Sequence, residues 1–216
     1  MITIKDRLNI FIDEIGDFGF VDGSSDLYAV SFTLHESKDS IENDLKYLNE
    51  KLEQLDYDGM IHLAYLVAKR GDYSHFTFER RKSIFWAIFY FSSRAKVKIK
   101  TIVVDKKYLN KKPQLNMALA KEISKFIENN KEYINSFEKI VIYYDNGQET
   151  LATILDTLFA SNQNVERRID FDHKQNDYFK FLICSQLLIN LIIKEEIIFR
   201  LLKTKITFSQ VRILDI

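Results

Sequence analysis

The segment Ile10-Phe11-Ile12-Asp13-Glu14-Ile15-Gly16-Asp17-Phe18-Gly19-Phe20 does most to define the fold of this chain. A short apolar run leads directly into two carboxylates, Asp13 and Glu14, and the run predicts a β-strand over residues 9–13. A buried strand normally excludes unpaired carboxylates, because removing each one from water costs several kcal/mol. Two carboxylates at a strand end therefore indicate a cation held between them and a partner, for which Asp145 is the downstream candidate.

The composition limits the classes of protein to which the chain can belong. Its 216 residues suit one domain with a substantial core, and 31 Lys plus Arg balance 31 Asp plus Glu, so net charge does not argue for or against nucleic acid. The single cysteine, Cys184, excludes an intramolecular disulfide and favours a reducing compartment. Residues 1–8 lack a signal-peptide core, and the longest apolar stretch, 187–193, is too short to span a bilayer. We therefore expect a soluble, cytoplasmic protein that does not enter a membrane.

Hydrophobic periodicity predicts strands and helices along the whole chain. The expected strands are 9–13, 27–34, 97–104, 139–144 and 165–171. The expected helices are 41–55, 78–91, 115–134, 149–160 and 177 to about 199. When the helices between about 40 and 95 are set aside as an insertion after the second strand, the element order is that of a ribonuclease H-like fold. We therefore expect a single α/β domain over 1–216, with a mixed five-stranded sheet flanked by helices.

In a ribonuclease H-like sheet the first and fourth strands are neighbours, so Asp13 is expected to approach Asp145 at the carboxyl ends of the two strands. Mg²⁺ or Mn²⁺ at such a pair could position a water and stabilise the leaving oxygen of a phosphodiester. Taken alone, Asp145-Asn146-Gly147 is a common strand-ending turn, and only its pairing with Asp13 favours metal binding. Glu14 is an auxiliary ligand or general base, or it points to the opposite face, because neighbours in a strand alternate.

Other polar residues have both a functional and a structural interpretation. His62 follows the Asp58-Gly59 turn and is a candidate to contact a water or a phosphate, the alternative being an ordinary surface histidine. Asp17 is interpreted as a solvated turn residue. Three basic clusters either contact phosphates or form a solvated surface. These clusters are Arg80-Arg81-Lys82, then Lys96, Lys98 and Lys100, and finally Lys106, Lys107, Lys111 and Lys112.

Several sequence landmarks are spread over most of the chain. They are Asp-Glu-x-Gly-Asp-Phe-Gly at 13–19, Ile-His-x-Ala at 61–64, Tyr73, Glu79-Arg80, Tyr-Tyr-Asp-Asn-Gly-Gln at 143–148, and Asp177-Tyr178. In these landmarks the chain resembles the bacterial domain-of-unknown-function 3800 family, whose fold is similar to that of ribonuclease H. The resemblance implies a nuclease or a nuclease-like protein, and some family members lie near mobile elements and phage-defence genes.

The chain departs from this family in the closing helix, which usually carries Gln-x-Ala-Asp. The corresponding residues are Leu182-Ile183-Cys184-Ser185, so Ser185 stands where the resemblance implies a carboxylate. Asp177 cannot replace it, because eight helical residues separate the two by about 12 Å. Metal binding is therefore expected to be weak. Three interpretations stay open: a slow nuclease, a degenerate nuclease that binds nucleic acid or a protein partner without cutting, and a domain that acts only in assembly, for example as a homo-oligomer.

Overall fold

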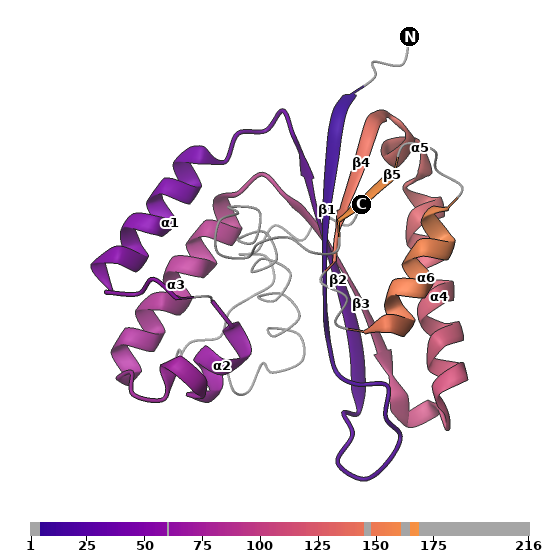
Figure 1. The fold of residues 1–216 in the computed structure, drawn as a ribbon, viewed down its shortest axis with the longest axis horizontal. Coiled ribbons are helices and arrows are strands. Elements are labelled where there is room, and N and C mark those ends of the chain that lie inside the picture. The colour runs from indigo at the N-terminus through magenta and orange to yellow at the C-terminus, as the bar shows by residue number, and fades with distance from the viewer. Residues whose placement is uncertain (1–4, 60, 145–147, 161–164, 169–216) are drawn as a thin grey trace.

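The computed structural model describes residues 5–59, 61–144, 148–160 and 165–168. These residues form a mixed five-stranded sheet with the strand order β3-β2-β1-β4-β5 (Figure 1). The strands are β1 (Lys5–Ile15), β2 (Leu27–Glu36), β3 (Lys98–Asp105), β4 (Phe137–Tyr143) and β5 (Val165–Arg168). β2 is antiparallel to both β1 and β3, whereas β4 is parallel to both β1 and β5. This is the expected α/β fold with a ribonuclease H-like arrangement.

Helices cover both faces of the sheet (Figure 1). The segment between β2 and β3 holds α1 (Glu42–Gln54), α2 (Leu63–Ala68), the 3-10 helix η1 (Gly71–Tyr73) and α3 (Phe78–Arg94). The remaining helices are the 3-10 helix η2 (Lys106–Tyr108), α4 (Lys112–Asn129), α5 (Lys131–Asn135) and α6 (Glu149–Phe159). We call the side covered by α1 to α3 the insertion face, and the side covered by α4 and α6 the opposite face. The helical insertion expected after the second strand is confirmed.

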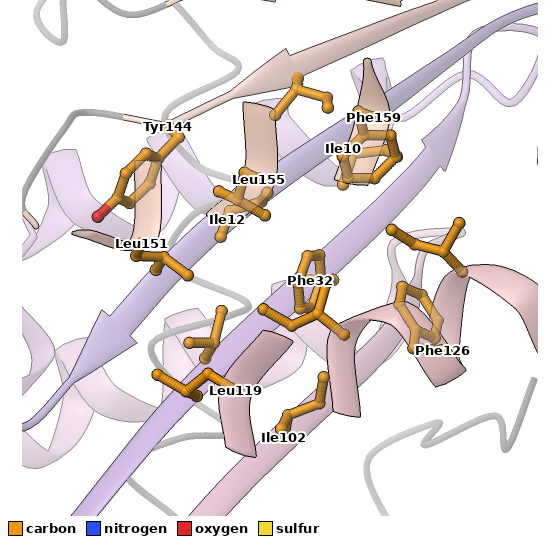
Figure 2. Close-up of a cluster of buried hydrophobic side chains, with 14 of the residues drawn as sticks. Ile10, Ile12, Phe32, Ile102, Leu119, Phe126, Tyr144, Leu151, Leu155 and Phe159 are labelled. Atoms are coloured by element: carbon orange, nitrogen blue, oxygen red, sulfur yellow. The ribbon is translucent and has the colours of Figure 1, made fainter. Parts of the chain in front are cut away.

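The alternation of side chains along β1 supplies both halves of the core. Ile10 and Ile12 pack on the opposite face with Leu119 of α4 and Leu155 of α6 (Figure 2). Phe11 belongs to the cluster on the insertion face, which contains most of the buried side chains of α1 and α3. Because each face of β1 is buried under helices, its register against its neighbours is strongly specified.

Several element boundaries differ from expectation, and two of the differences concern the helix expected at 115–134. The helix expected at 115–134 is two helices, α4 and α5, and the Asn130 side-chain amide donates to the Phe126 carbonyl at 2.8 Å where α4 ends. α4 begins at Lys112, before the expected start at residue 115. Pro113 fits in its first turn, because the backbone N–H that proline lacks would have no hydrogen-bond partner in the helix there.

The helix expected at 177–199 lies outside the described residues, and one domain over 1–216 stays a prediction. Within the part of the chain that the structure describes, no helix has both the length and the apolar composition that crossing a bilayer requires.

Candidate functional site

Asp13 and Glu14 lie inside β1, because the strand continues to Ile15. Asp13 pairs with Ser31 of β2, and Glu14 pairs with Val30. Successive side chains of a strand point to opposite faces, so Asp13 belongs to the insertion face and Glu14 to the opposite face. Both residues are half-buried. The two carboxylates therefore do not approach one cation from the same side of the sheet.

Glu14 is connected to the end of β4. The Tyr144 hydroxyl donates to Glu14 Oε1 at 3.1 Å and accepts the backbone N–H of Gln148 at 2.8 Å. Gln148 is the residue before α6, so one hydroxyl joins the end of β1 to the start of that helix. Burial, followed by the negative charge of Glu14, raises the pKa of the neighbouring Tyr28.

Sequence reasoning missed this role of Tyr144. A signal was present, because two adjacent tyrosines end a buried strand and must face opposite sides of the sheet. Tyr143 packs with Phe11 on the insertion face, whereas Tyr144 belongs to the cluster on the opposite face. The alternation predicts the face of each ring, but it does not identify Glu14 as the partner of the hydroxyl.

Asp13 lies in a row of polar side chains that crosses three strands on the insertion face. Its register partner Ser31 pairs in turn with Thr101 of β3. The hydroxyls of Ser31 and Thr101 are 3.1 Å apart, and Ser31 is fully buried. Direct partners in antiparallel strands have Cβ atoms about 5 Å apart, so this carboxylate has a hydroxyl-bearing neighbour at close range. Buried polar side chains continue along this face of β1 and β2, because Phe11 pairs with Thr33 and Asn9 pairs with His35.

Asp145 lies outside the described residues, as do Ser185 and the rest of the expected closing helix. The structure confirms that β1 and β4 are parallel neighbours, and the last described pair joins Phe11 to Tyr143. Asp13 comes two residues after Phe11, and Asp145 comes two residues after Tyr143. Among the described residues, no cluster of three or more His, Cys, Asp and Glu side chains could hold a metal ion. The described residues thus contribute one insertion-face carboxylate to the predicted site.

The glycines after the carboxylates shape the loop between β1 and β2. Gly16 has φ of +108°, and a Cβ there would lie 2.5 Å from the carbonyl oxygen of Leu27. The Asp17 carboxylate accepts the N–H of Gly19 at 2.7 Å and that of Ser25 at 2.8 Å. These hydrogen bonds, that of Ser25 above all, hold the pKa of Asp17 below its usual value. Asp17 therefore organises the loop as well as being partly solvated, a role that its interpretation as a solvated turn residue missed.

His62 lies in the helical insertion, where it precedes α2. Its backbone N–H donates to the Tyr73 hydroxyl at 3.0 Å, and its exposed ring lies against the ring of Tyr65 with centroids 5.6 Å apart. These two contacts, with Tyr73 and Tyr65, both lie within the helical insertion and do not involve Asp13 or Glu14. Both contacts agree with the interpretation of His62 as a surface histidine, and its contact with a water or a phosphate stays a prediction.

The first basic cluster is largely structural. Arg81 is 8% exposed, and its Nη1 donates to the carbonyl oxygens of Leu66 and Val67 at the end of α2. Burial lowers the pKa of this guanidinium. Arg80 donates to the Asp56 carbonyl at 2.6 Å and lies over the ring of Phe76. Both arginines therefore form their contacts with other residues of the helical insertion.

Two lysines of the second cluster also have partners in the chain. Lys96 forms an ion pair of 3.9 Å with Asp39, and the Lys98 ammonium lies 3.8 Å from the centroid of the Tyr133 ring. The third cluster differs, because three of its four lysines are exposed.

Comparison with family models, curated proteins and solved structures finds no match to this chain. The likeness to the domain-of-unknown-function 3800 family therefore rests on the sequence landmarks.

Proposed function

We propose that this protein is a metal-dependent nuclease that hydrolyses phosphodiester bonds in DNA or RNA. The observation that carries the proposal is the parallel pairing of β1 with β4, in which Phe11 and Tyr143 are partners two residues before Asp13 and Asp145. Parallel strands end at the same edge of a sheet, so continued pairing would place the two carboxylates together there. A pair of carboxylates, completed by waters, matches the preference of Mg²⁺ and Mn²⁺ for oxygen ligands.

Asp13 suits such a site by its position. It is half-buried on the insertion face and its register partner is a serine, so the carboxylate has hydroxyl-bearing neighbours as well as apolar ones. Such hydroxyls can hydrogen-bond the waters that Mg²⁺ retains when only one or two carboxylates bind it. A bound ion would lower the pKa of a water and stabilise the leaving oxygen of the phosphodiester. The role that we assign to Asp13 is to hold that ion.

We assign Glu14 to positioning instead of direct metal binding. Its carboxylate accepts a hydrogen bond from Tyr144 on the opposite face, and Tyr144 also binds the residue that precedes α6. Glu14 would thus fix the ends of β1 and β4 relative to each other. A role as auxiliary ligand or general base would have to be carried out from the opposite face of the sheet, because that is the face to which Glu14 belongs.

The alternative function is a degenerate nuclease that binds a nucleic acid or a protein partner without cutting. Ser185 favours it, because a neutral hydroxyl stands where the family resemblance implies a third carboxylate. Ser185→Asp separates the two functions: cutting and metal binding that appear only in this variant would identify the natural protein as a disabled enzyme. We place either activity in the cytoplasm, on the basis of the single cysteine.

The test is cleavage of labelled single- and double-stranded DNA and RNA with Mg²⁺ or Mn²⁺, with Mn²⁺ binding followed by electron paramagnetic resonance. Asp13→Asn and Asp145→Asn keep the side-chain volume and remove the charge, so both should lose cutting and Mn²⁺ binding. Asp22→Asn is the control, because Asp22 is an exposed carboxylate in the loop between β1 and β2. Unchanged cleavage by Asp13→Asn would exclude this site.

A further inference from the structure

Three exposed lysines of the third basic cluster share one surface with an exposed aromatic ring. The basic–aromatic surface consists of Lys107 and Tyr108 on η2 together with Lys111 and Lys112 at the start of α4. Tyr108 is 76% exposed, the highest value for a large aromatic side chain in the described residues. Lys111 and Lys112 are exposed, and no carboxylate within the described residues forms an ion pair with either. Lys107 is paired with Asp105 at 2.7 Å, so the charge of the surface rests mainly on the other two lysines.

The surface rests on a fixed backbone. The Lys106 side chain is buried, and its ammonium donates to the Asp17 carbonyl at 2.9 Å. The backbone N–H of Lys106 donates to the backbone carbonyl of Asp26 at 2.8 Å. These two bonds tie η2 to the loop between β1 and β2. On the other side, the Lys112 ammonium lies 5.3 Å from the ring centroid of Phe18, which packs in the core. The backbone of η2 before Tyr108 is therefore anchored to the loop between β1 and β2, and the Lys112 side chain lies against the core residue Phe18.

This surface lies at the end of the sheet where β1 ends, because β1 and β3 run in the same direction on either side of β2 (Figure 1). Asp13 pairs with Ser31, which pairs with Thr101, so the two strands are two spacings, about 10 Å, apart. Asp105, the last residue of β3, lies about 13 Å further along that strand. The backbone of the surface thus begins on the order of 16 Å from the Asp13 backbone within the sheet, although Asp13 belongs to the insertion face and α4 covers the opposite face.

We propose that the basic–aromatic surface binds single-stranded nucleic acid, with phosphates at Lys111 and Lys112 and a base stacked on Tyr108. This inference rests on the proposed function for the class of polymer and names the surface that would hold it. An exposed tyrosine accepts any base, because every base has a π-face, whereas in a duplex the bases are stacked on one another and unavailable. The Lys107 ammonium lies 4.8 Å from the centroid of the Tyr108 ring, and Lys111 and Lys112 follow that ring within four residues of the chain. Exposed cations next to an exposed ring in the sequence are expected where a strand is held by its backbone and one base at the same time.

The experiment measures binding without metal, so that it does not depend on cutting. A fluorescent single strand of about 16 nucleotides, the upper end of known single-strand site sizes, is titrated with the full chain in EDTA. Tyr108→Ala should weaken binding about tenfold, as expected for one lost stacked base. Lys111→Gln/Lys112→Gln should reduce the slope of log affinity against log salt by about 1.4, or 0.7 for each phosphate contact.

Matched controls come from the same chain. Lys121→Gln/Lys125→Gln removes the same charge from exposed positions further along α4, and Tyr90→Ala removes a half-exposed tyrosine from α3. These variants should bind as the wild type does. Equal losses of affinity in the test and control variants would overturn the proposal. Absence of oligonucleotide binding by the wild type would also overturn it. So would a competition experiment in which polyglutamate displaces the labelled strand as readily as unlabelled strand does.

The outcomes also separate this inference from the proposed function. If the binding pattern holds and no variant or condition gives cutting, the nuclease proposal fails and this surface stands. If the wild type cuts and the KM is unchanged in Tyr108→Ala and in Lys111→Gln/Lys112→Gln, the surface assignment fails and the nuclease proposal stands. Thermal unfolding of each variant verifies that the fold is retained, as the exposure of all three side chains predicts.

Discussion

The ring of Phe11 on β1 stacks on the ring of Tyr143 on β4, with centroids 4.7 Å apart and planes inclined by 12°. Both rings are fully buried, and the two residues are direct partners in the parallel pairing. The stacked pair therefore fixes the register of β1 against β4 immediately before the two carboxylates that the proposed site requires. A shift of one residue would bury Asp13 on the other face of the sheet.

The hydroxyl of Tyr144 can be tested against that of Tyr28, which is also fully buried on the opposite face. Tyr144→Phe removes the donor to Glu14 and the acceptor of Gln148, and should lower the free energy of unfolding by about 1–2 kcal/mol. Tyr28→Phe should be neutral or stabilising, because its hydroxyl has no hydrogen-bond partner within the described residues. Urea unfolding of both variants measures the difference, and equal losses would contradict the assigned role of Tyr144.

An added methyl group should destabilise the fold by different amounts at two glycines of the loop between β1 and β2. Gly16→Ala combines positive φ with a Cβ only 2.5 Å from a backbone carbonyl, and should destabilise the fold by more than about 1 kcal/mol. Gly23 also has positive φ, but a Cβ there meets nothing within 4 Å. Gly23→Ala therefore measures the conformational cost alone. The melting temperature of Gly16→Ala should be well below that of Gly23→Ala, and the opposite order would refute the steric argument.

The contribution of Asp17 to stability should depend on pH. Its pKa is lower in the folded chain than in the unfolded chain, chiefly because its carboxylate accepts the N–H of Ser25. The contribution is therefore present above the ordinary pKa of an aspartate, about 3.9, and is lost as the pH falls through the lower folded-state value. The difference in unfolding free energy between wild type and Asp17→Asn should shrink on acidification. A difference for Asp17→Asn that stays constant as the pH falls would contradict the prediction.

Adjacent cations of the first basic cluster should differ in their effect on stability. Arg81→Met removes the donors to two carbonyl groups at the end of α2, and should cost about 1–3 kcal/mol. Lys82→Met removes the same charge one residue later, at a partly exposed position, and should cost much less. Chemical unfolding measures both, and the nucleic-acid titration provides a second measurement. Neither variant should change the salt dependence of binding, because neither residue belongs to the basic–aromatic surface.

Local patterns predicted much of the fold because strands and helices have different periods. The apolar run before Asp13 and the second run at 27–34 predicted two strands, and they pair as an antiparallel hairpin. The break at Asn130 was not predicted, because the residues on both sides of it continue a helical pattern. The extension of β1 to Ile15 was also missed, because charged residues at a strand end resemble a loop when their cross-strand partners are unknown.

The sequence alone determined the order of the elements, the insertion after the second strand and the position of Asp13 near the end of a buried strand, because hydrophobic periodicity is a local property. Tertiary structure decided which polar residues meet. It joined Glu14 to Tyr144, which are 130 positions apart, buried Arg81 under the carbonyls of α2, and left Tyr108, Lys111 and Lys112 exposed. Such contacts depend on which faces of distant elements pack together, and that is set by burial of the whole core.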